Sequence, residues 1–342
     1  MIFVTGGTGM VGAHLLYDLC CRGEKVRALK RPGSNIQKTE KIFSYYSSDY
    51  KSLLQNIEWV EGDILDKECL YVHLIGIDRI YHAAAMVSFD HKDRQQMLEN
   101  NSQGTANMVD VALSLKIPRF CHVSSIAAIG TPPDGIEANE FHPWRNNINH
   151  SSYAESKYVS EMEVWRATID GLNAVIVNPS VILGPGDWKS SGSPALFYNV
   201  GKGMKFYTKG GTGFVDVKDV TSAMWQLMQD DVWEKVKNQR FILNSRNILF
   251  RELFSQIAVA LKVDPPKYFA GNALLKLAGL FSQIQGLLTG SRPKLTKETI
   301  RSANKISYYD GSKICSEIGF SYTPVEDSIR NISEIYLKDH VR

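Results

Sequence analysis

A tyrosine and a lysine four residues apart, Tyr153 and Lys157, are the pair in this sequence best suited to acid–base chemistry. On a helix, residues at this spacing lie on one face, so the ammonium would stand one turn from the phenol. A phenol normally titrates near about pH 10, and a nearby positive charge lowers its pKa toward the neutral range. The same spacing is common on solvated helix faces, so the surrounding elements must decide whether it forms a site.

The composition is that of an ordinary globular protein. The chain has 342 residues, of which 44% are apolar and 22% charged, and its formal net charge is +3. The lysines and arginines are scattered and do not form the dense basic run that nucleic-acid binding would need. No stretch approaches the roughly 20 apolar residues of a membrane span. The five cysteines show no C-x-x-C spacing or cluster with histidine. We therefore expect a reduced, cytoplasmic protein without a metal site.

The N-terminus has the pattern of a strand, a glycine-rich turn and a helix. The apolar run 2–4 precedes the turn, and a helical apolar pattern from Ala13 follows it. In this context glycines permit a tight turn, close approach to a pyrophosphate and close helix–strand packing, so we predict dinucleotide binding. Backbone amides at the helix start would hold the phosphates. The turn residues expected at the cofactor are Gly6, Thr8, Gly9, Met10, Val11 and Gly12.

The end of the second strand indicates which dinucleotide is bound. An acidic residue there binds the ribose 2′-hydroxyl, whereas arginine accommodates a 2′-phosphate. After Leu29 the chain continues into Lys30 and Arg31 with no carboxylate, and Lys38 could supply further positive charge. We therefore expect NADP(H), with NAD(H) as the alternative. The other interpretation of these residues is a solvated basic loop.

Strand patterns followed by helices continue through the first half of the chain. Asp63 follows the third strand and could accept a hydrogen bond from an adenine amino group, and the small residues 83–85 would let a cofactor lie against the backbone. A fifth strand ends at Ser124 and Ser125, and a sixth covers 174–177. About six β–α units predict a doubly wound, Rossmann-type parallel sheet with helices on both faces.

Two further polar positions favour structural interpretations. His82, at the end of the fourth strand, is interpreted as a packed histidine rather than a catalyst. Asn101 and Gly104 fall inside a helix expected over residues 93–115. Asparagine and glycine inside a helix usually mark a local distortion or close packing.

In family order, these motifs resemble those of an extended short-chain dehydrogenase/reductase, of the NAD-dependent epimerase/dehydratase superfamily. The resemblance spans most of residues 1–190, and the segments 214–220 and 309–320 extend it nearly to the C-terminus. The matching motifs are Thr5-Gly-x-x-Gly-x-x-Gly12, Gly62-Asp63, His82-Ala-Ala-Ala85, Asn101-x-x-Gly-Thr105, Ser124-Ser125, Tyr153-x-x-x-Lys157 and Asn178-Pro179-Ser180 before Gly184-Pro185-Gly186.

The resemblance implies roles for individual residues. Tyr153 would be the acid/base, Lys157 would lower its pKa and bind the nicotinamide ribose, and Ser125 would orient the substrate oxygen. It also implies a homodimer through the helices near 93–116 and 153–170. The remaining cofactor contacts that it implies are Asp63 and Ile64 at the adenine, Ala83, Ala84 and Ala85 along the cofactor, and Pro179, Ser180 and Val181 near the nicotinamide.

Departures from the family pattern indicate the branch. Dehydratases carry an Asp-Glu pair shortly after the catalytic serine or threonine, but Ser125 is followed by Ile-Ala-Ala-Ile. Sugar-nucleotide enzymes commonly show Arg-x-x-Asn-x-Tyr-Gly-Pro, and residues 178–185 lack both the arginine and the tyrosine. The chain is more similar to the dihydroflavonol-reductase and 3β-hydroxysteroid-dehydrogenase branch. Its members act on apolar ketones, aldehydes and alcohols.

The C-terminal half is expected to cover the substrate. We predict a Rossmann domain over residues 1–180 and a smaller α/β lobe over 181–342, with some segments returning to the Rossmann sheet. Within the lobe we expect a helix near 194–200 and a strand pair within 205–217. The apolar stretch 270–288 is interpreted as a pair of buried or lid helices. A membrane-surface helix is the alternative, but the stretch lacks a clustered basic face.

The predicted function is an NADP(H)-dependent reductase or dehydrogenase that interconverts a carbonyl and an alcohol on a small, apolar molecule. An apolar lid fits this substrate class, because ligand pockets are mostly apolar with few polar anchors. Two alternatives stay open: an NAD-dependent nucleotide-sugar epimerase, and a non-catalytic dinucleotide sensor. A sensor would not need Ser125, Tyr153 and Lys157.

Overall fold

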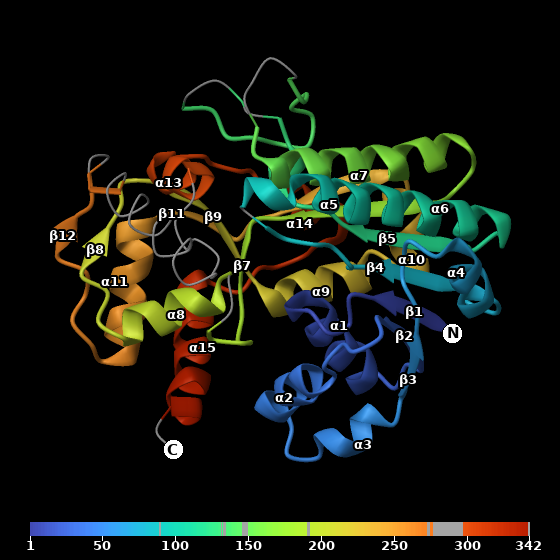
Figure 1. Ribbon diagram of the computed structural model, residues 1–342, viewed down its shortest axis with the longest axis horizontal. Coiled ribbons are helices and arrows are strands. Elements are labelled where there is room, and N and C mark those ends of the chain that lie inside the picture. Colours follow the sequence, from blue (N-terminus) through green and yellow to red (C-terminus); the bar gives the residue numbers. More distant parts are fainter. Residues whose placement is uncertain are drawn as a thin grey trace.

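The computed structural model describes residues 1–340 except 89, 131, 133–134, 146–149, 190–191, 272–273 and 276–296 (Figure 1). A parallel sheet of seven strands dominates the described chain, and its order reverses between β1 and β4. Ligands of doubly wound sheets bind at such a switch point. In spatial order the strands are β10 (Gln239–Leu243), β6 (Ala174–Pro179), β5 (Arg119–Val123), β4 (Arg79–His82), β1 (Ile2–Thr5), β2 (Val26–Lys30) and β3 (Ile57–Glu61).

Helices cover both faces of this sheet, which is why its central strands are almost continuously apolar. All residues of β1 and β6 are buried. One face packs against α1 (Met10–Cys21), α2 (Gln37–Tyr46), α3 (Tyr50–Leu54), α9 (Val217–Gln226), α10 (Asp230–Val236) and α14 (Ser312–Ile318). The other packs against α4 (Lys67–Leu74), α6 (Gly104–Ser114) and α7 (Ser152–Ile169).

A second hydrophobic core lies in the lobe beside the sheet (Figure 1). It joins the helices α8 (Pro194–Gly201), α11 (Phe250–Leu261) and α15 (Val325–His340) to a small sheet of β11 (Arg246–Leu249), β9 (Gly211–Asp216) and β7 (Val181–Leu183). A separate ribbon pairs β8 (Phe206–Tyr207) with β12 (Tyr268–Phe269), and a further helix of the C-terminal half is α13 (Lys297–Asn304).

The expected fold class is confirmed, and the structure adds two details. The helix expected over 93–115 is divided into α5 (Arg94–Leu98), a π-helical turn (Glu99–Gln103) and α6, so Asn101 and Gly104 do mark a distortion. β10, from the C-terminal half, pairs with β6 and forms the edge of the main sheet. The helix expected near 194–200 is α8.

One expectation for the lobe was wrong. The strands within 205–217, β8 and β9, do not pair with each other, because β8 pairs with β12 while β9 lies between β11 and β7. Both partners come from later in the chain, which local patterns do not reveal. Most of the apolar stretch 270–288 lies outside the described residues, so its interpretation stays a prediction.

Candidate active site

The helix α7 brings Tyr153 and Lys157 to the carboxyl end of β5. Ser151 caps the helix, because its Oγ accepts a hydrogen bond from the amide of Ala154 at 3.1 Å. Tyr153 is partly exposed, whereas Lys157 is buried and its Nζ donates to the carbonyl oxygen of Val123, the last residue of β5, at 2.9 Å. The predicted pair therefore faces the sheet rather than solvent.

The two serines after β5 have different partners. Ser124 is buried, and its Oγ donates to a carboxylate oxygen of Glu161 at 2.7 Å, away from Tyr153. Ser125 is partly exposed, and its side chain hydrogen-bonds to that of Tyr153. Its Oγ also accepts from the amide of Ala127 at 3.1 Å. The structure thus brings Ser125, and not Ser124, together with Tyr153.

The pKa of Tyr153 shifts in the direction opposite to the one expected. Burial raises it above 10.0, and the hydrogen bond from Ser125 only partly opposes that shift. The ammonium of Lys157 is bound to the carbonyl of Val123. In the protein alone, Tyr153 is therefore a neutral phenol at neutral pH, which suits a proton donor.

Lys157 has a perturbed pKa as well. Burial lowers it from 10.5 to about 8, and the negative charge of Glu161 works against that shift. Glu161 lies one helical turn after Lys157 on α7, so Tyr153, Lys157 and Glu161 share one face. The charge state of Lys157 thus depends on this carboxylate.

Glu161 was not singled out from the sequence, although its spacing of four from Lys157 was a usable signal. Its side chain is fully buried and is satisfied by four donors. Arg240 on β10 supplies an ion pair at 3.0 Å, and Asn178 Nδ2 donates at 2.8 Å while also donating to the carbonyl oxygen of Ser125 at 3.0 Å. The other two donors are Ser124 Oγ and Trp165 Nε1. This network fixes the backbone that carries Ser125.

The glycine turn between β1 and α1 has the geometry that a pyrophosphate requires. Gly6 has a positive φ of +74°, and a Cβ there would lie 2.6 Å from the backbone of Ala83. A Cβ on Gly12 would lie 2.1 Å from the carbonyl oxygen of Gly6. At the start of α1, Gly9 provides no side-chain cap, which leaves helix amides for an anion. These residues fit a dinucleotide.

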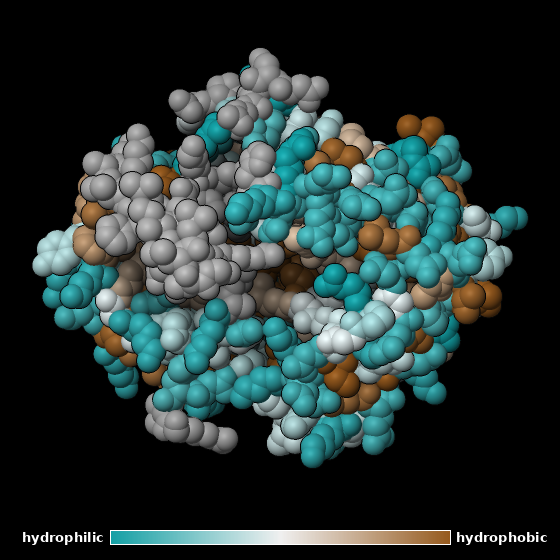
Figure 2. Space-filling model, in the orientation of Figure 1, coloured by the Kyte–Doolittle hydropathy of each residue, from teal (hydrophilic) through white to brown (hydrophobic). Residues whose placement is uncertain are grey.

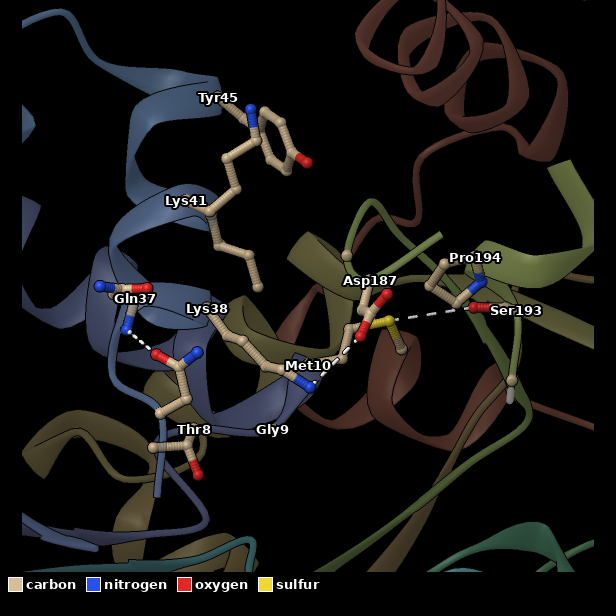
Figure 3. Close-up of a pocket in the computed structure, with 14 residues that line it drawn as sticks. Thr8, Gly9, Met10, Gln37, Lys38, Lys41, Tyr45, Asp187, Ser193 and Pro194 are labelled. Atoms are coloured by element: carbon tan, nitrogen blue, oxygen red, sulfur yellow. Dashed lines mark hydrogen bonds and ion pairs between the residues drawn. The ribbon is translucent and has the colours of Figure 1, made fainter. Parts of the chain in front are cut away.

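Beside this turn lies a cavity of about 450 Å³, lined by Thr8, Gly9 and Met10 on one side (Figure 3). Lys38 reaches across it from α2, and its Nζ lies 3.2 Å from a carboxylate oxygen of Asp187. Arg31 is exposed and has no ion-pair partner among the described residues, but it does not line this cavity. Lys30 is paired with Glu61. The structure therefore brings Lys38, and not Arg31, to the cavity.

The other predicted cofactor residues lie at the carboxyl ends of neighbouring strands. Asp63 accepts from the amide of Leu65 at 3.0 Å, while Asp66 caps α4. Ile64 is buried, Ala83 and Ala84 lie beside Gly6 and are partly exposed, and Ala85 is exposed. After β6, Pro179 and Ser180 are buried and Val181 is partly exposed. Ser180 Oγ has no hydrogen-bond partner in the described structure.

Both structural interpretations of the polar residues are consistent with the contacts. His82 is fully buried between the hydroxyls of Thr5 and Thr105, at 2.8 and 3.1 Å, and burial lowers its pKa from 6.5 to about 3. Asn101, in the π-helical turn, exchanges hydrogen bonds with the backbone of Met86 and donates to Ser156 on α7. The π-helical turn between α5 and α6 is therefore hydrogen-bonded to α7, the helix that carries Tyr153 and Lys157.

Sequence comparison connects this geometry to a known family. A model of the NAD dependent epimerase/dehydratase family matches residues 2–239. The chain belongs to that family. Within it, the chain is an NAD(P)-dependent oxidoreductase of the extended short-chain type, and its relatives include reductases of the expected branch.

Two relatives in this family cover nearly the whole chain. One, from Synechocystis, carries the provisional name dihydroflavonol 4-reductase and is 30% identical over 96% of this chain and 92% of its own length. Sterol demethylase protein B of Methylococcus capsulatus is 29% identical over 92% of both chains. The crystal structure of gox2253 superimposes with a TM-score of 0.79, at 28% identity, over 99% of this chain and 98% of its own.

The fold extends to more distant members. UDP-glucose 4-epimerase of Thermotoga maritima superimposes with a TM-score of 0.77 over 99% of both chains, at 18% identity. That likeness shows the shared fold alone.

Proposed function

We propose that the protein is an NADP(H)-dependent reductase that interconverts a carbonyl and an alcohol on a small, apolar substrate. The observation that carries the proposal is the convergence of Ser125, Tyr153 and Lys157 at the carboxyl end of β5, which only β4 separates from β1 and its glycine turn. A bound NADPH would supply the hydride. A non-catalytic dinucleotide sensor would need the glycine turn to bind its ligand but would not need these three side chains.

In the reduction, Tyr153 acts as the general acid. Its raised pKa keeps the phenol protonated at neutral pH, so it can donate a proton to the oxygen that develops negative charge. Ser125 donates a hydrogen bond to the same oxygen and holds the carbonyl in place. Lys157 supplies a positive charge one helical turn from Tyr153, and its hydrogen bond to the Val123 carbonyl oxygen fixes the position of its ammonium group. In the oxidation Tyr153 acts as the base.

The preference for NADP(H) is supported by the charges around the adenosine end. No carboxylate follows β2 in the sequence, Arg31 is exposed without an ion-pair partner in the described structure, and Lys38 lies at the cavity beside Thr8 and Gly9. A 2′-phosphate would offer these cations a counterion. The expected homodimer and the cytoplasmic location stay predictions.

The substrate class is supported by the surface and by the relatives. Figure 2 shows a recess near the middle of the face in view, with apolar side chains at its base. Several relatives are named for apolar substrates, including 3-beta-hydroxysteroid dehydrogenase of Mycolicibacterium neoaurum, which aligns with 54% of this chain. The chain also has no acidic pair after Ser125 to run an elimination.

The test is to follow NADPH and NADH oxidation with a panel of apolar ketones and aldehydes, and with nucleotide-sugars. The variant Tyr153→Phe should lower kcat by about 100- to 10,000-fold, the usual contribution of a positioned acid. Tyr158→Phe is the matched control, since Tyr158 is on the same helix but stacks on Trp144. Unchanged kcat in Tyr153→Phe would contradict the mechanism. Interconversion of nucleotide-sugars without net cofactor turnover would instead identify an epimerase.

A further inference from the structure

One end of the molecule carries a cluster of lysines and exposed aromatic rings that the proposed function does not use. The ribbon of β8 and β12 lies at the far end of the lobe, opposite α4 and α6 (Figure 1). Together with the residues that flank each strand, the ribbon comprises residues 201–210 and 262–269. We refer to these two segments together as the aromatic ribbon.

The aromatic ribbon exposes large rings to solvent. Phe206 is 46% exposed, Tyr268 is 60% exposed and Phe269 is 50% exposed. Parallel pairing sets Phe206 beside Tyr268, with ring centroids 5.9 Å apart, and Tyr207 beside Phe269 at 6.0 Å. Successive residues of a strand point to opposite faces, so rings lie on both faces of the ribbon.

Positive charge is concentrated on the same residues. The ribbon contains five lysines and one acidic residue, Asp264, so it is net +4, whereas the whole chain is net +3. Asp264 pairs with Lys267, and the other four lysines have no ion-pair partner in the part of the chain that the structure describes. The lysines are Lys202, Lys205, Lys209, Lys262 and Lys267.

The arrangement of these charges is unfavourable for an isolated protein. The register places Lys205 next to Lys267, whose amide donates to the Lys205 carbonyl oxygen at 3.1 Å. Like charges opposite each other in a sheet are destabilising. Arg251 adds a further cation over the ring of Tyr207, at 4.9 Å. An anionic surface would relieve this repulsion.

We propose that the aromatic ribbon docks peripherally on an anionic lipid bilayer. Aromatic rings favour the interface between water and lipid, and lysine stems can lie along apolar surface while the ammonium groups reach the headgroups. Attraction to anionic lipid increases with each lysine near the surface. None of the described helices is long and apolar enough to cross a membrane. The proposal is independent of the substrate and of the reaction.

The experiment is co-sedimentation of the whole purified protein with vesicles of phosphatidylcholine alone, or of phosphatidylcholine with about one-quarter phosphatidylglycerol. We expect binding to the anionic vesicles, weak binding to the neutral ones, and loss of binding in high salt, because salt screens exposed charges. Failure to bind anionic vesicles would overturn the proposal and point to an acidic protein as the partner. Equal binding to both vesicles would also overturn it.

Two variants and their controls test the ribbon itself. Lys205→Gln with Lys267→Gln should weaken binding to anionic vesicles by at least about tenfold, given the contribution of each lysine near such a surface. Lys25→Gln with Lys51→Gln removes the same charge from exposed lysines elsewhere and should bind like the wild type. If the two double variants bind equally, the ribbon is not the docking site.

The aromatic test follows the same design. Phe206→Ser with Tyr268→Ser should weaken vesicle binding by at least about tenfold, since buried apolar area would be lost. Ile169→Ser is the control, because Ile169 is 87% exposed at the end of α7. All variants should keep wild-type melting temperature and NADPH binding. Unimpaired vesicle binding by the folded aromatic variant would overturn the proposed role of the rings.

Discussion

At the scale of single residues, Glu161 controls the charge of the active site. It is buried one turn beyond Lys157, and its carboxylate raises the pKa of that lysine against the effect of burial. His82 and His122 also lie near Lys157, but burial lowers their pKa values, so both are neutral at neutral pH. The guanidinium of Arg240 forms an ion pair with the same carboxylate. Glu161 is therefore a positioning residue rather than a catalytic one.

Replacing Glu161 should change the pH dependence of catalysis. In Glu161→Gln the lysine loses its neighbouring negative charge, so the pKa of Lys157 falls below about 8 and the ammonium is lost at lower pH. We expect the alkaline limb of kcat/KM for carbonyl reduction to move down by about one pH unit. Glu161→Asp, which keeps the charge, should shift less. Glu163→Gln, which removes a partly exposed carboxylate of the same helix, should leave the profile in place. An unmoved limb in Glu161→Gln would refute this role.

At the scale of elements, the glycine turn has both a folding role and a binding role. Gly12→Ala would place a Cβ 2.1 Å from the Gly6 carbonyl oxygen, so the turn or α1 must move. Such overpacking costs about 1–3 kcal/mol, and we expect the melting temperature to fall by several degrees even without cofactor. Gly9→Ala has its nearest contact at 3.3 Å and should melt within about 2 °C of the wild type. Equal melting of the two variants would show that the close contact is not limiting.

The cavity between α2 and the loop after β7 permits a second test (Figure 3). Lys38 is paired with Asp187, so a 2′-phosphate must compete with this carboxylate for it. We expect Lys38→Gln to raise KM for NADPH about tenfold, equivalent to about 1.4 kcal/mol, and to leave KM for NADH unchanged. Asp187→Asn should have the opposite effect on NADPH. Equal changes for both cofactors in Lys38→Gln would place Lys38 away from the 2′-phosphate.

The elements differ in how far the sequence could predict them. The strand, turn and helix around Gly6 and Gly12 are local, so their order was readable from adjacent residues. The partner of β8 was not, because β12 lies far along the chain and both strands have two residues. The same applies to the active site. Tyr153 and Lys157 were identified by spacing, but the ion pair of Glu161 depends on Arg240, which only the folded sheet brings near.

At the scale of the whole molecule, buried histidines make stability depend on pH. Burial lowers the pKa of His82 to about 3 and that of His14 to about 4, from 6.5 in the unfolded chain. Below about pH 6.5 the unfolded state binds protons that the folded state does not, so stability is present above that pH and falls below it. Asp219 opposes this, because burial raises its pKa to about 6 and its protonated form is favoured in the fold. Burial also raises the pKa values of Asp18 and Glu140, which act with Asp219, and lowers that of His122, which acts with the other two histidines.

We expect His14 and His82 each to lower the free energy of unfolding by about 2 kcal/mol between about pH 6.5 and about pH 5, before the opposing carboxyl groups are counted. Urea denaturation at both pH values measures this. In His82→Gln the decrease should be smaller by about that amount, because one titrating group is gone while an amide can still meet Thr5 and Thr105. A decrease equal to that of the wild type would show that His82 is not the group that titrates.

The position of β10 at the edge of the main sheet has a consequence for synthesis on the ribosome. β6 emerges well before β10, and at about 5–20 residues per second the interval is about 3 to 12 seconds. During this time the edge of β6 is unpaired and the nascent chain presents an open template to other strands. Until β10 is translated, the carboxylate of Glu161 also lacks its ion-pair partner Arg240, the cation that permits its burial. The helix α7 can reach its final environment only after β10 has been translated, so chaperone dependence should be concentrated in that interval.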